Sequence, residues 1–457
     1  MRARAAEFGA VLDLEQVRWI ICGGLVSVTA GLAIARQPTL ALGVAAFGIG
    51  AVTLRRWPQG AWVVAGTVSL FFVNWARNTA AGHHGSEVIY VADLIPVFLI
   101  ISLVSIADLQ ERLRPRLSLW LGALFLILVA GGFYRTYTSL GLTPALQVRE
   151  LLPLALCVAL PLSRRFREVA AHDIATILSL LAVGIAIRSF YRLGTGYSTT
   201  TQLGVERIYQ TWEPFIAATI ALTLLGYVLV ARRVHRVHYL GLALAPVPVL
   251  FSFFRTAWVL SFGIGLLLFL IVRHGQRRAQ LFVGVTLLIA TLLFSSQFVR
   301  PESGKTLVSQ ITLRSSQIHL QLDSYRTQEY HAVWSEIRKH PIIGSGFGTE
   351  YQGDWTVYTT WSHNAYEWIW WRLGLIGLVV FLAFLTCVGW ATTRALPGLE
   401  QDDLGLAVGL LAGLAFVVLA ANLHENFENY QSNLFDALVI AQLMVLAIRG
   451  SHQSAPS

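Results

Sequence analysis

Apolar runs long enough to cross a lipid bilayer recur along almost the whole of this 457-residue sequence, from Trp19 to Leu446. The hydrocarbon core of a bilayer takes about 20 apolar residues per helix, and about 17 suffice. Backbone N–H and C=O groups find no water there, so a spanning segment of this kind must satisfy them within a helix. The sequence therefore predicts an all-α polytopic membrane protein with about 12–14 transmembrane helices. The expected spans are residues 17–35, 39–54, 60–76, 88–107, 117–133, 145–162, 173–190, 212–231, 239–254, 256–272, 279–298, 366–391, 404–422 and 432–448.

The overall composition agrees with membrane embedding. The chain is 55% hydrophobic and 13% charged, and its mean hydropathy is +0.60. Soluble domains carry about 25% charged residues. The three cysteines, Cys22, Cys157 and Cys387, fall inside apolar runs and lack the spacing of a zinc site or a disulfide framework. We therefore expect no large soluble domain.

The positive charge of the chain lies in short arginine clusters between the apolar runs. The formal net charge is +9, almost all of it from arginine, since Lys305 and Lys339 are the only lysines. Clusters fall at every second connection, at residues 55–56, 112–116, 164–167, 232–236 and 273–278. Basic residues mark cytoplasmic loops, so this alternation predicts that both termini are cytoplasmic. Nucleic acid is not an expected partner, because its binding would need a soluble basic face.

Polar segments gather on the opposite, outward side, and one of them is long. This loop, residues 299–365, contains a helical pattern from Leu320 to His340. We expect that helix to pack on the membrane surface or over the mouth of the bundle. The chain thus divides into an N-terminal transmembrane bundle (1–298), a loop with helices (299–365) and C-terminal transmembrane helices (366–457).

Outward-facing arginines are candidate anion ligands. Arg255 stands among aromatic residues at the turn between two short apolar runs, and an arginine at membrane depth tends to be functional. Arg188 and Arg207 belong to a second polar segment. A guanidinium group can bind two phosphate oxygens at once through two N–H groups. The ordinary alternatives are an interface arginine that reaches into water and a solvated loop with surface ion pairs.

A histidine lies at the end of the long loop, in Trp361-Ser-His-Asn-Ala-Tyr-Glu367. At such a junction His363 can take a proton from a hydroxyl near neutral pH, and a helix-capping role is the alternative. Motifs for other chemistries are missing from the sequence: it has no Walker loop, no dinucleotide glycine motif, no H-E-x-x-H and no G-x-S-x-G. We therefore expect no metal and no nucleotide or other cofactor.

Ordered motifs around this histidine carry a family resemblance. Arg326-Thr-Gln-Glu-Tyr330 is followed by His340-Pro-Ile-Ile-Gly-Ser-Gly-Phe-Gly348, then Ser362-His-Asn-Ala-Tyr366, then Leu373-Gly-Leu-Ile-Gly377. In this order and spacing they resemble the O-antigen ligase/polymerase family. The motifs cover residues 326–377, and the expected topology is similar to that family along the whole chain.

The resemblance implies a metal-independent, GT-C-like glycosyltransferase of the bacterial inner membrane, with its active site facing the periplasm. Its donor would be an undecaprenyl-diphosphate-linked glycan, and its acceptor lipid A–core or a second lipid-linked glycan. The family's loop histidine maps onto His363, as the base for the acceptor hydroxyl or as a ligand of the diphosphate. Its diphosphate-binding arginines map onto Arg207 and Arg255. Further expected substrate-binding residues are Arg188, Arg326, Asn364 and Trp361.

Two alternatives stay open. A ligase joins finished glycan to lipid A–core, whereas an O-antigen or exopolysaccharide polymerase extends a lipid-linked chain; the single long loop that bears His363 favours the ligase. A transporter or flippase would show paired inverted repeats and ionisable residues at mid-membrane. No internal duplication is evident, and Asp93 is the one residue that points to this second class.

Overall fold

The computed structural model describes residues 48–72, 80–84, 87–105, 108, 117–195, 200–202, 205–207, 212–252, 254–272, 325–351, 360, 362–422 and 429–453. Within them, seven helical segments are long and apolar enough to cross a membrane. They are α7 (Leu117–Leu140), the segment Leu142–Leu162, α11 (Ala171–Gly194), α12 (Glu213–Val230), α19 (Ala365–Ala395), α20 (Gln401–Ala421) and α21 (Tyr430–Gln453).

Shorter helices complete the described bundle. Those that are apolar are α3 (Gly60–Thr67) with η1 (Val68–Phe72), α5 (Val91–Leu103), α13 (Arg236–Leu244) with α14 (Pro246–Phe251), and α15 (Arg255–Ile271). The segment Leu142–Leu162 is built from α8 (Leu142–Ala145), η2 (Leu146–Leu154), α9 (Ala155–Ala159) and η3 (Leu160–Leu162). The expected all-α polytopic membrane fold is confirmed. The expected spans at 17–35 and 279–298 lie outside the described residues.

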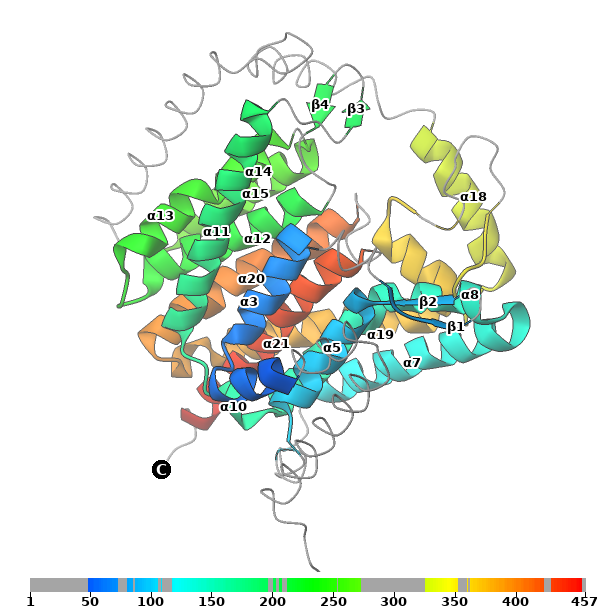
Figure 1. Cartoon of the computed structure of the whole chain (residues 1–457), viewed down its shortest axis with the longest axis horizontal. Coiled ribbons are helices and arrows are strands. Elements are labelled where there is room, and N and C mark those ends of the chain that lie inside the picture. The colour runs from blue at the N-terminus through cyan, green and yellow to red at the C-terminus, as the bar shows by residue number, and fades with distance from the viewer. Residues whose placement is uncertain are drawn as a thin grey trace, which may run out of the picture.

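Two short antiparallel hairpins accompany the helices of this all-α fold. Strand β1 (Ala80–His84) pairs with β2 (Glu87–Tyr90), and β3 (Thr200–Gln202) pairs with β4 (Val205–Arg207). The helix expected in the long loop is α18 (Tyr325–Lys339), which packs against α19. Both hairpins and α18 appear in Figure 1.

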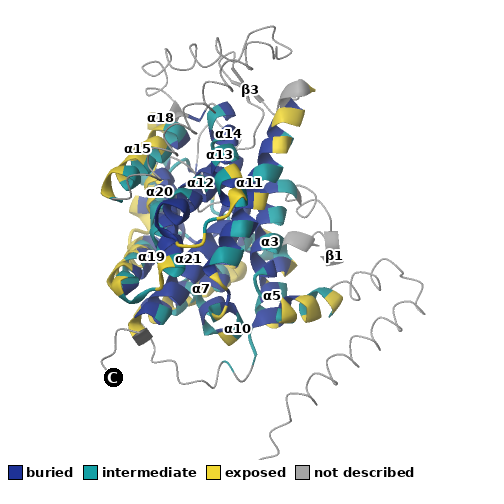
Figure 2. Ribbon diagram, turned by 90° about the vertical axis from the view of Figure 1, so that its left-hand side faces the viewer, coloured by how far each residue is buried: buried dark blue, intermediate teal, exposed yellow. Residues whose placement is uncertain are grey.

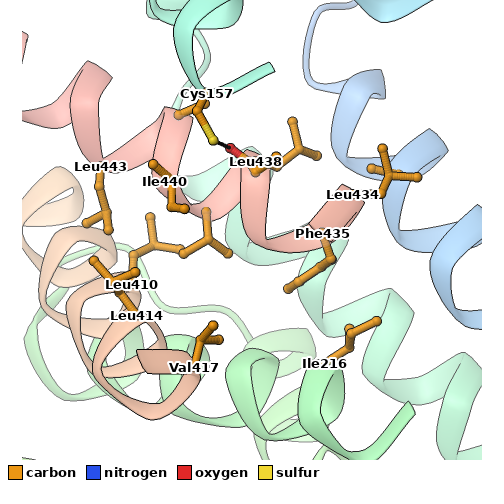
Figure 3. Packing of buried hydrophobic residues seen from close by; sticks show 14 of the residues in the cluster. Cys157, Ile216, Leu410, Leu414, Val417, Leu434, Phe435, Leu438, Ile440 and Leu443 are labelled. Atoms are coloured by element: carbon orange, nitrogen blue, oxygen red, sulfur yellow. Dashed lines mark hydrogen bonds between the residues drawn. The ribbon is translucent and has the colours of Figure 1, made fainter. Parts of the chain in front are cut away.

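Helices α12, α20 and α21 form the centre of the bundle. Where α12 crosses α20, a Cβ on Gly226 would overlap the backbone of Gly409, so these two glycines bring the helix axes close together. Helix α21 is buried along most of its length, as the dark blue ribbon in Figure 2 shows. Leu410 and Leu443 belong to the apolar core between α20 and α21, and the buried Sγ of Cys157 lies 3.6 Å from the carbonyl oxygen of Ala437 (Figure 3).

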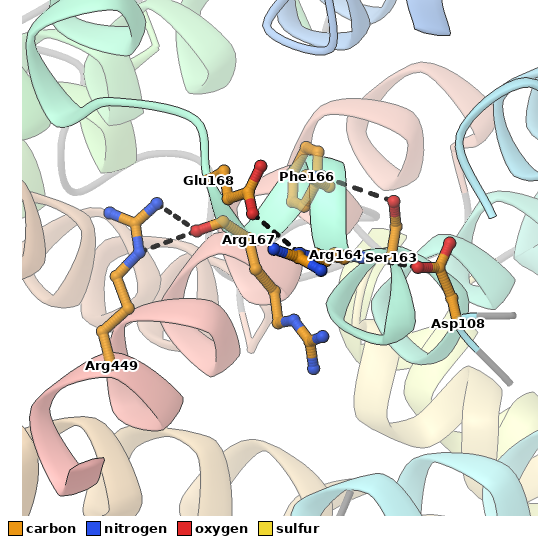
Figure 4. A network of polar contacts seen from close by, with 7 residues as sticks. All are labelled: Asp108, Ser163, Arg164, Phe166, Arg167, Glu168 and Arg449. Atoms are coloured by element: carbon orange, nitrogen blue, oxygen red, sulfur yellow. Dashed lines mark hydrogen bonds and ion pairs between the residues drawn. The ribbon is translucent and has the colours of Figure 1, made fainter. Parts of the chain in front are cut away.

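The two ends of the bundle differ in their polar groups. In Figure 1 α10 (Arg164–Arg167) and the C-terminus lie at one end, whereas α18 and the β3–β4 hairpin lie towards the other. Arg449 near the end of α21 donates to the carbonyl oxygen of Arg167 (Figure 4). It also donates to the carbonyl oxygen of Val169 and forms an ion pair with Asp403 at 2.9 Å. The arginine clusters expected on one side of the membrane thus meet, in this part of the chain, at one end of the bundle.

Candidate functional site

His363 lies directly before α19, and a carboxylate of α18 holds its imidazole. Nδ1 of His363 is 2.6 Å from Oε2 of Glu329, and the main-chain N–H of His363 donates to Oε1 of the same side chain at 2.7 Å. Glu329 is buried, with 4% of its surface exposed, whereas 43% of the His363 side chain is exposed. A carboxylate accepts a hydrogen bond, so Nδ1 carries the proton and Nε2 of the neutral ring keeps its lone pair.

The next residue, Asn364, explains why α19 begins at this point. Its side-chain oxygen accepts hydrogen bonds from the main-chain N–H groups of Tyr366 and Glu367, at 3.0 and 3.3 Å, as an N-cap residue does. Its amide nitrogen donates to Asn422 at the end of α20, at 3.1 Å. These contacts fix the position of His363 relative to α20, and a role for Asn364 in substrate binding stays a prediction.

Helix α19 is interrupted about two and a half turns after it begins. Gly374 has φ +74°, and a Cβ there would overlap the carbonyl oxygen of Ile342. In an unbroken helix the N–H groups of Leu375 and Ile376 would bond to the carbonyls of residues 371 and 372. Here they donate instead to the carbonyl oxygens of Pro341 and Ile342, at 2.9 and 3.3 Å.

The same inserted segment satisfies the carbonyl groups that the break leaves open. Ser345 donates its main-chain N–H to the carbonyl oxygen of Trp371 at 2.7 Å, and Gly346 donates to that of Arg372 at 3.0 Å. Backbone polar groups at membrane depth need such partners, because lipid supplies none. Residues 341–346 and the break in α19 are therefore one structural unit, and the first part of α19 is a half-helix over 365–373.

A second polar group joins α11 to α12. Glu213, the first residue of α12, is 2% exposed, and its two carboxylate oxygens lie 2.7 Å from Arg188 Nη1 and 2.8 Å from Arg192 Nη1. The Arg188 guanidinium also lies over the ring of Phe71, 5.8 Å from its centre. One carboxylate thus lies between two cations, which leaves this group of three with a net positive charge. Sequence reasoning placed Arg188 here, but it selected neither Arg192 nor Glu213.

The other arginines expected at the site are located by their backbone positions. Arg207 ends β4 opposite Thr200, and Arg255 is the first residue of α15. Phe254, which precedes Arg255, packs its ring 6.0 Å from that of Phe215 on the first turn of α12. Arg255 therefore begins its helix beside the helix end that carries Glu213. Arg326 is the second residue of α18, three positions before Glu329, and Trp361 lies outside the described residues.

Helix α20 connects the histidine group and the arginine group. The ring of its Phe416 lies 5.9 Å from that of Phe215, two residues after Glu213. Two residues further along, the carbonyl oxygen of Val418 accepts a hydrogen bond from the hydroxyl of Tyr366 at 2.5 Å. Asn422, which bonds to Asn364, ends the same helix. Residues 416 to 422 rise about 9 Å along an α-helix, so both groups lie at the same end of the bundle.

Glu329 is the main residue of this site that sequence reasoning missed. It lies in the motif Arg326-Thr-Gln-Glu-Tyr330, but a glutamate on an amphipathic loop helix ordinarily faces water. Only the packing of α18 against α19 buries it against His363. Among the described residues, no group of three or more His, Cys, Asp or Glu side chains is placed to hold a metal ion.

Fold and site together define a polytopic helical membrane protein with a histidine–carboxylate pair and an arginine group at one end of its bundle. A family model described as O-Antigen ligase matches residues 240–382, which run from α13 into α19 and include Arg255, α18 and His363. The chain therefore carries an O-antigen ligase domain, and the family expected from the motifs is confirmed. No curated protein matches the chain.

Proposed function

We propose that this protein is an O-antigen ligase-type glycosyltransferase that moves a glycan from an undecaprenyl-diphosphate donor to lipid A–core, with His363 as the base. The observation that carries the proposal is the contact of His363 Nδ1 with the buried Glu329. A carboxylate in that position orients the ring, selects the tautomer with a basic Nε2 and stabilises the imidazolium that forms. With 43% of its side chain exposed, His363 is accessible to a substrate hydroxyl.

The reaction then needs one proton transfer and one displacement. Nε2 of His363 takes the proton of an acceptor sugar hydroxyl, and the oxygen forms a bond to the anomeric carbon of the donor glycan. The bond from that carbon to the diphosphate oxygen breaks, and its electron pair leaves with undecaprenyl diphosphate. The donor already carries a good leaving group, so the step needs no nucleotide.

The surroundings of His363 favour the base over a diphosphate ligand. Glu329 contacts the ring directly, and Glu367 lies on the first turn of α19, with Oε1 3.5 Å from the Asn364 side-chain nitrogen. The Glu329 carboxylate in contact with the ring disfavours a bound anion at that point. The N-terminal amides of α19 that would attract an anion are taken by the Asn364 cap.

The arginine group is the better place for the diphosphate. Arg188 and Arg192 share the single carboxylate of Glu213, and Arg255 begins α15 beside them in the fold. Fixed cations that meet the charge growing on the leaving group lower the barrier electrostatically. We therefore propose Arg188, Arg207 and Arg255 as diphosphate ligands, and Arg326, Asn364 and Trp361 as contacts of the sugars.

The proposed orientation puts this end in the periplasm and both termini in the cytoplasm. Its support is the gathering of Arg167, Arg233 and Arg449 at the opposite end, where cytoplasmic basic residues belong. We propose with this orientation a GT-C-like architecture, an inner-membrane location and the use of the outward-facing loop.

The test is a transfer assay with purified protein, lipid-linked glycan and two acceptors, lipid A–core and a second lipid-linked repeat. Transfer to lipid A–core is expected, and a product only with the second acceptor would make the protein a polymerase instead. His363→Ala should reduce transfer on the order of 10²- to 10⁴-fold, because a general base contributes that much. His331→Ala, an exposed histidine on the same helix as Glu329, is the matched control and should keep activity.

Transfer to neither acceptor by folded protein would remove the transferase proposal. Full activity in His363→Ala would leave the family unaffected but would show that the base lies elsewhere.

A further inference from the structure

Arg372 is a cation buried completely inside a membrane helix, with none of its surface exposed. It lies on the half-helix of α19, two residues before Gly374, and its guanidinium lies 3.6 Å from the ring centre of the neighbouring Trp371. A buried cation in such a place is costly and is retained where it has a task. The partners of its guanidinium indicate what that task is.

The side chain of Arg372 joins two points of the chain that are eleven residues apart. Its Nη1 donates to the carbonyl oxygen of Thr349 at 2.8 Å and to the Thr349 hydroxyl at 2.5 Å, and its Nη2 donates to the carbonyl oxygen of Thr360 at 2.6 Å. One planar guanidinium has donors on both edges, which a lysine cannot reproduce. Arg372 therefore pins both ends of the segment 349–360 to the half-helix.

Both members of the histidine–carboxylate pair are attached to the segments that Arg372 holds. Thr360 precedes His363 by only three residues, so its anchoring limits where the imidazole can lie. Glu329 belongs to α18, and the chain after α18 leads to Gly346. The N–H of Gly346 donates to the main-chain carbonyl of Arg372, and the carbonyl of Gly346 accepts a hydrogen bond from Arg372 Nη1. One residue thus holds the chain on each side of the contact.

We propose that Arg372 is a positioning residue that keeps His363 against Glu329. It touches neither of the two side chains; it acts by fixing the chain before His363 and the chain after α18 on one rigid half-helix. Loss of its hydrogen bonds leaves the ends of 349–360 free to separate, so the contact of His363 with Glu329 loosens while the remainder of the bundle stays packed. The kinetic part of this inference rests on the proposed transfer function, but its structural part does not.

The structural test is residue-resolved hydrogen–deuterium exchange of the full-length protein in detergent. The amide of His363 donates to Glu329, so its exchange rate reports the contact directly. Arg372→Met should speed exchange at this amide, Arg372→Lys should do so less, and Thr349→Val, which removes one acceptor, should have the smallest effect. Arg449→Met is the matched control, because Arg449 also binds main-chain carbonyls but at the other end of the bundle.

Unchanged exchange at the His363 amide in Arg372→Met, or equal acceleration in Arg449→Met, would overturn the inference whether or not transfer is measured. If Arg372→Met does not fold, the same readout is taken from Arg372→Lys and Thr349→Val, and no acceleration in either has the same meaning.

The kinetic test is a double-mutant cycle with Glu329→Gln. Arg372→Met alone should lower kcat about 100-fold with little change in KM, because displacement of a catalytic group by about 1 Å costs that much. In the Glu329→Gln background it should lower kcat hardly further, since the contact that it supports is already lost. Fully additive effects would show that Arg372 acts by another route. If His363→Ala is fully active, the proposed base is wrong, and the exchange measurement still decides the role of Arg372.

Discussion

Two arginines, one at each end of the bundle, bind main-chain carbonyl groups, but they hold different segments of the chain. Arg449 is 21% exposed, forms an ion pair with Asp403 and ties the end of α21 to the carbonyls of Arg167 and Val169, ahead of α11. Arg372 is wholly buried, stacks on Trp371 and ties down the chain that leads to His363. The same donor chemistry therefore joins helix ends at one end of the molecule and anchors the chain before the proposed base, His363, at the other.

The two ends also differ in how their charges are arranged. A cavity of about 720 Å³ at the Arg449 end is lined by Arg232, Arg233 and Arg449 and by Glu400, Asp402 and Asp403, so its formal charges cancel. At the other end, Glu329 and Glu367 lie around His363, and the arginines gather on α11 and at the start of α15. Apart from Glu213, which lies between Arg188 and Arg192, the carboxylates are near His363 and the cations are on the other side of this end. The proposed transfer would use this arrangement, since the base needs a carboxylate partner and the leaving group needs cations.

The largest effect is expected for Glu329→Gln, which keeps the shape of the side chain but removes its charge. Transfer should fall on the order of 10²- to 10⁴-fold, as when a catalytic histidine loses its orienting carboxylate. Thermal unfolding should change little. The matched control is Glu336→Gln on the same helix, whose carboxylate contacts only Lys339 among the ion pairs of the described residues and should leave the rate unchanged. Equal losses in both variants would mean that α18 itself, rather than the histidine contact, had been damaged.

Gly374→Ala should have the next largest effect, on stability and activity together. The new Cβ would meet the Ile342 carbonyl at a residue with φ +74°, which costs about 3 kcal/mol. Gly389→Ala lies further along the same helix with no atom within 4 Å of the new Cβ, and should stabilise by about 0.5–1 kcal/mol. Thermal unfolding in detergent separates the two variants. A Gly374→Ala protein as stable as the wild type would show that the break in α19 is not needed.

Arg449→Met should lower stability without changing the chemistry. It removes hydrogen bonds from a charged donor and leaves Asp403 without that ion pair, a loss of about 2 kcal/mol. The midpoint of thermal unfolding should fall while kcat stays within about twofold of the wild type. A large fall in kcat in Arg449→Met would show that the Arg449 end also affects the transfer reaction.

Arg164→Ala is expected to have the smallest effect. The Arg164–Glu168 pair joins side chains that are 72% and 63% exposed, one helical turn apart. Such exposed pairs contribute about 0.3–0.5 kcal/mol, and salt screens them. A fall in stability well above that amount, measured by thermal unfolding at low and high salt, would show that the Arg164 end is less tolerant than its exposure indicates.

Much of the fold could be predicted from the sequence, because the thickness and apolar character of the bilayer set the length and hydropathy of a spanning helix. The span expected at 117–133 lies within α7, the span expected at 404–422 overlaps nearly all of α20, and Arg167 and Arg449 do share one end of the bundle. The number of spans, about 12–14 as expected, stays a prediction, since parts of the chain lie outside the described residues. The division of the chain into three parts at residues 298 and 365 also stays a prediction.

The site was predicted only in part. His363 and Asn364 stood out because a histidine before an apolar run is conspicuous, and Arg188 because it is charged at the end of a span. Arg192 and Glu213 belong to the same outward polar segment as Arg188 but were not selected, since nothing in the sequence reveals that Glu213 is buried between two arginines. Arg372 was overlooked because its neighbours in sequence are simply apolar, whereas its partners, Thr349 and Thr360, come from another segment.

The sequence by itself determined that this chain crosses a membrane and that its arginine clusters lie on one side of it. It also determined the O-antigen ligase motifs. These properties depend on the hydropathy, charge and order of residues along the chain, so they can be recognised without knowing which residues meet in the fold. Only the tertiary structure decided that Glu329 meets His363 and that Pro341–Gly346 completes the broken backbone of α19. Those contacts depend on which groups remain unpaired when helices pack, and such pairing is a property of the folded chain alone.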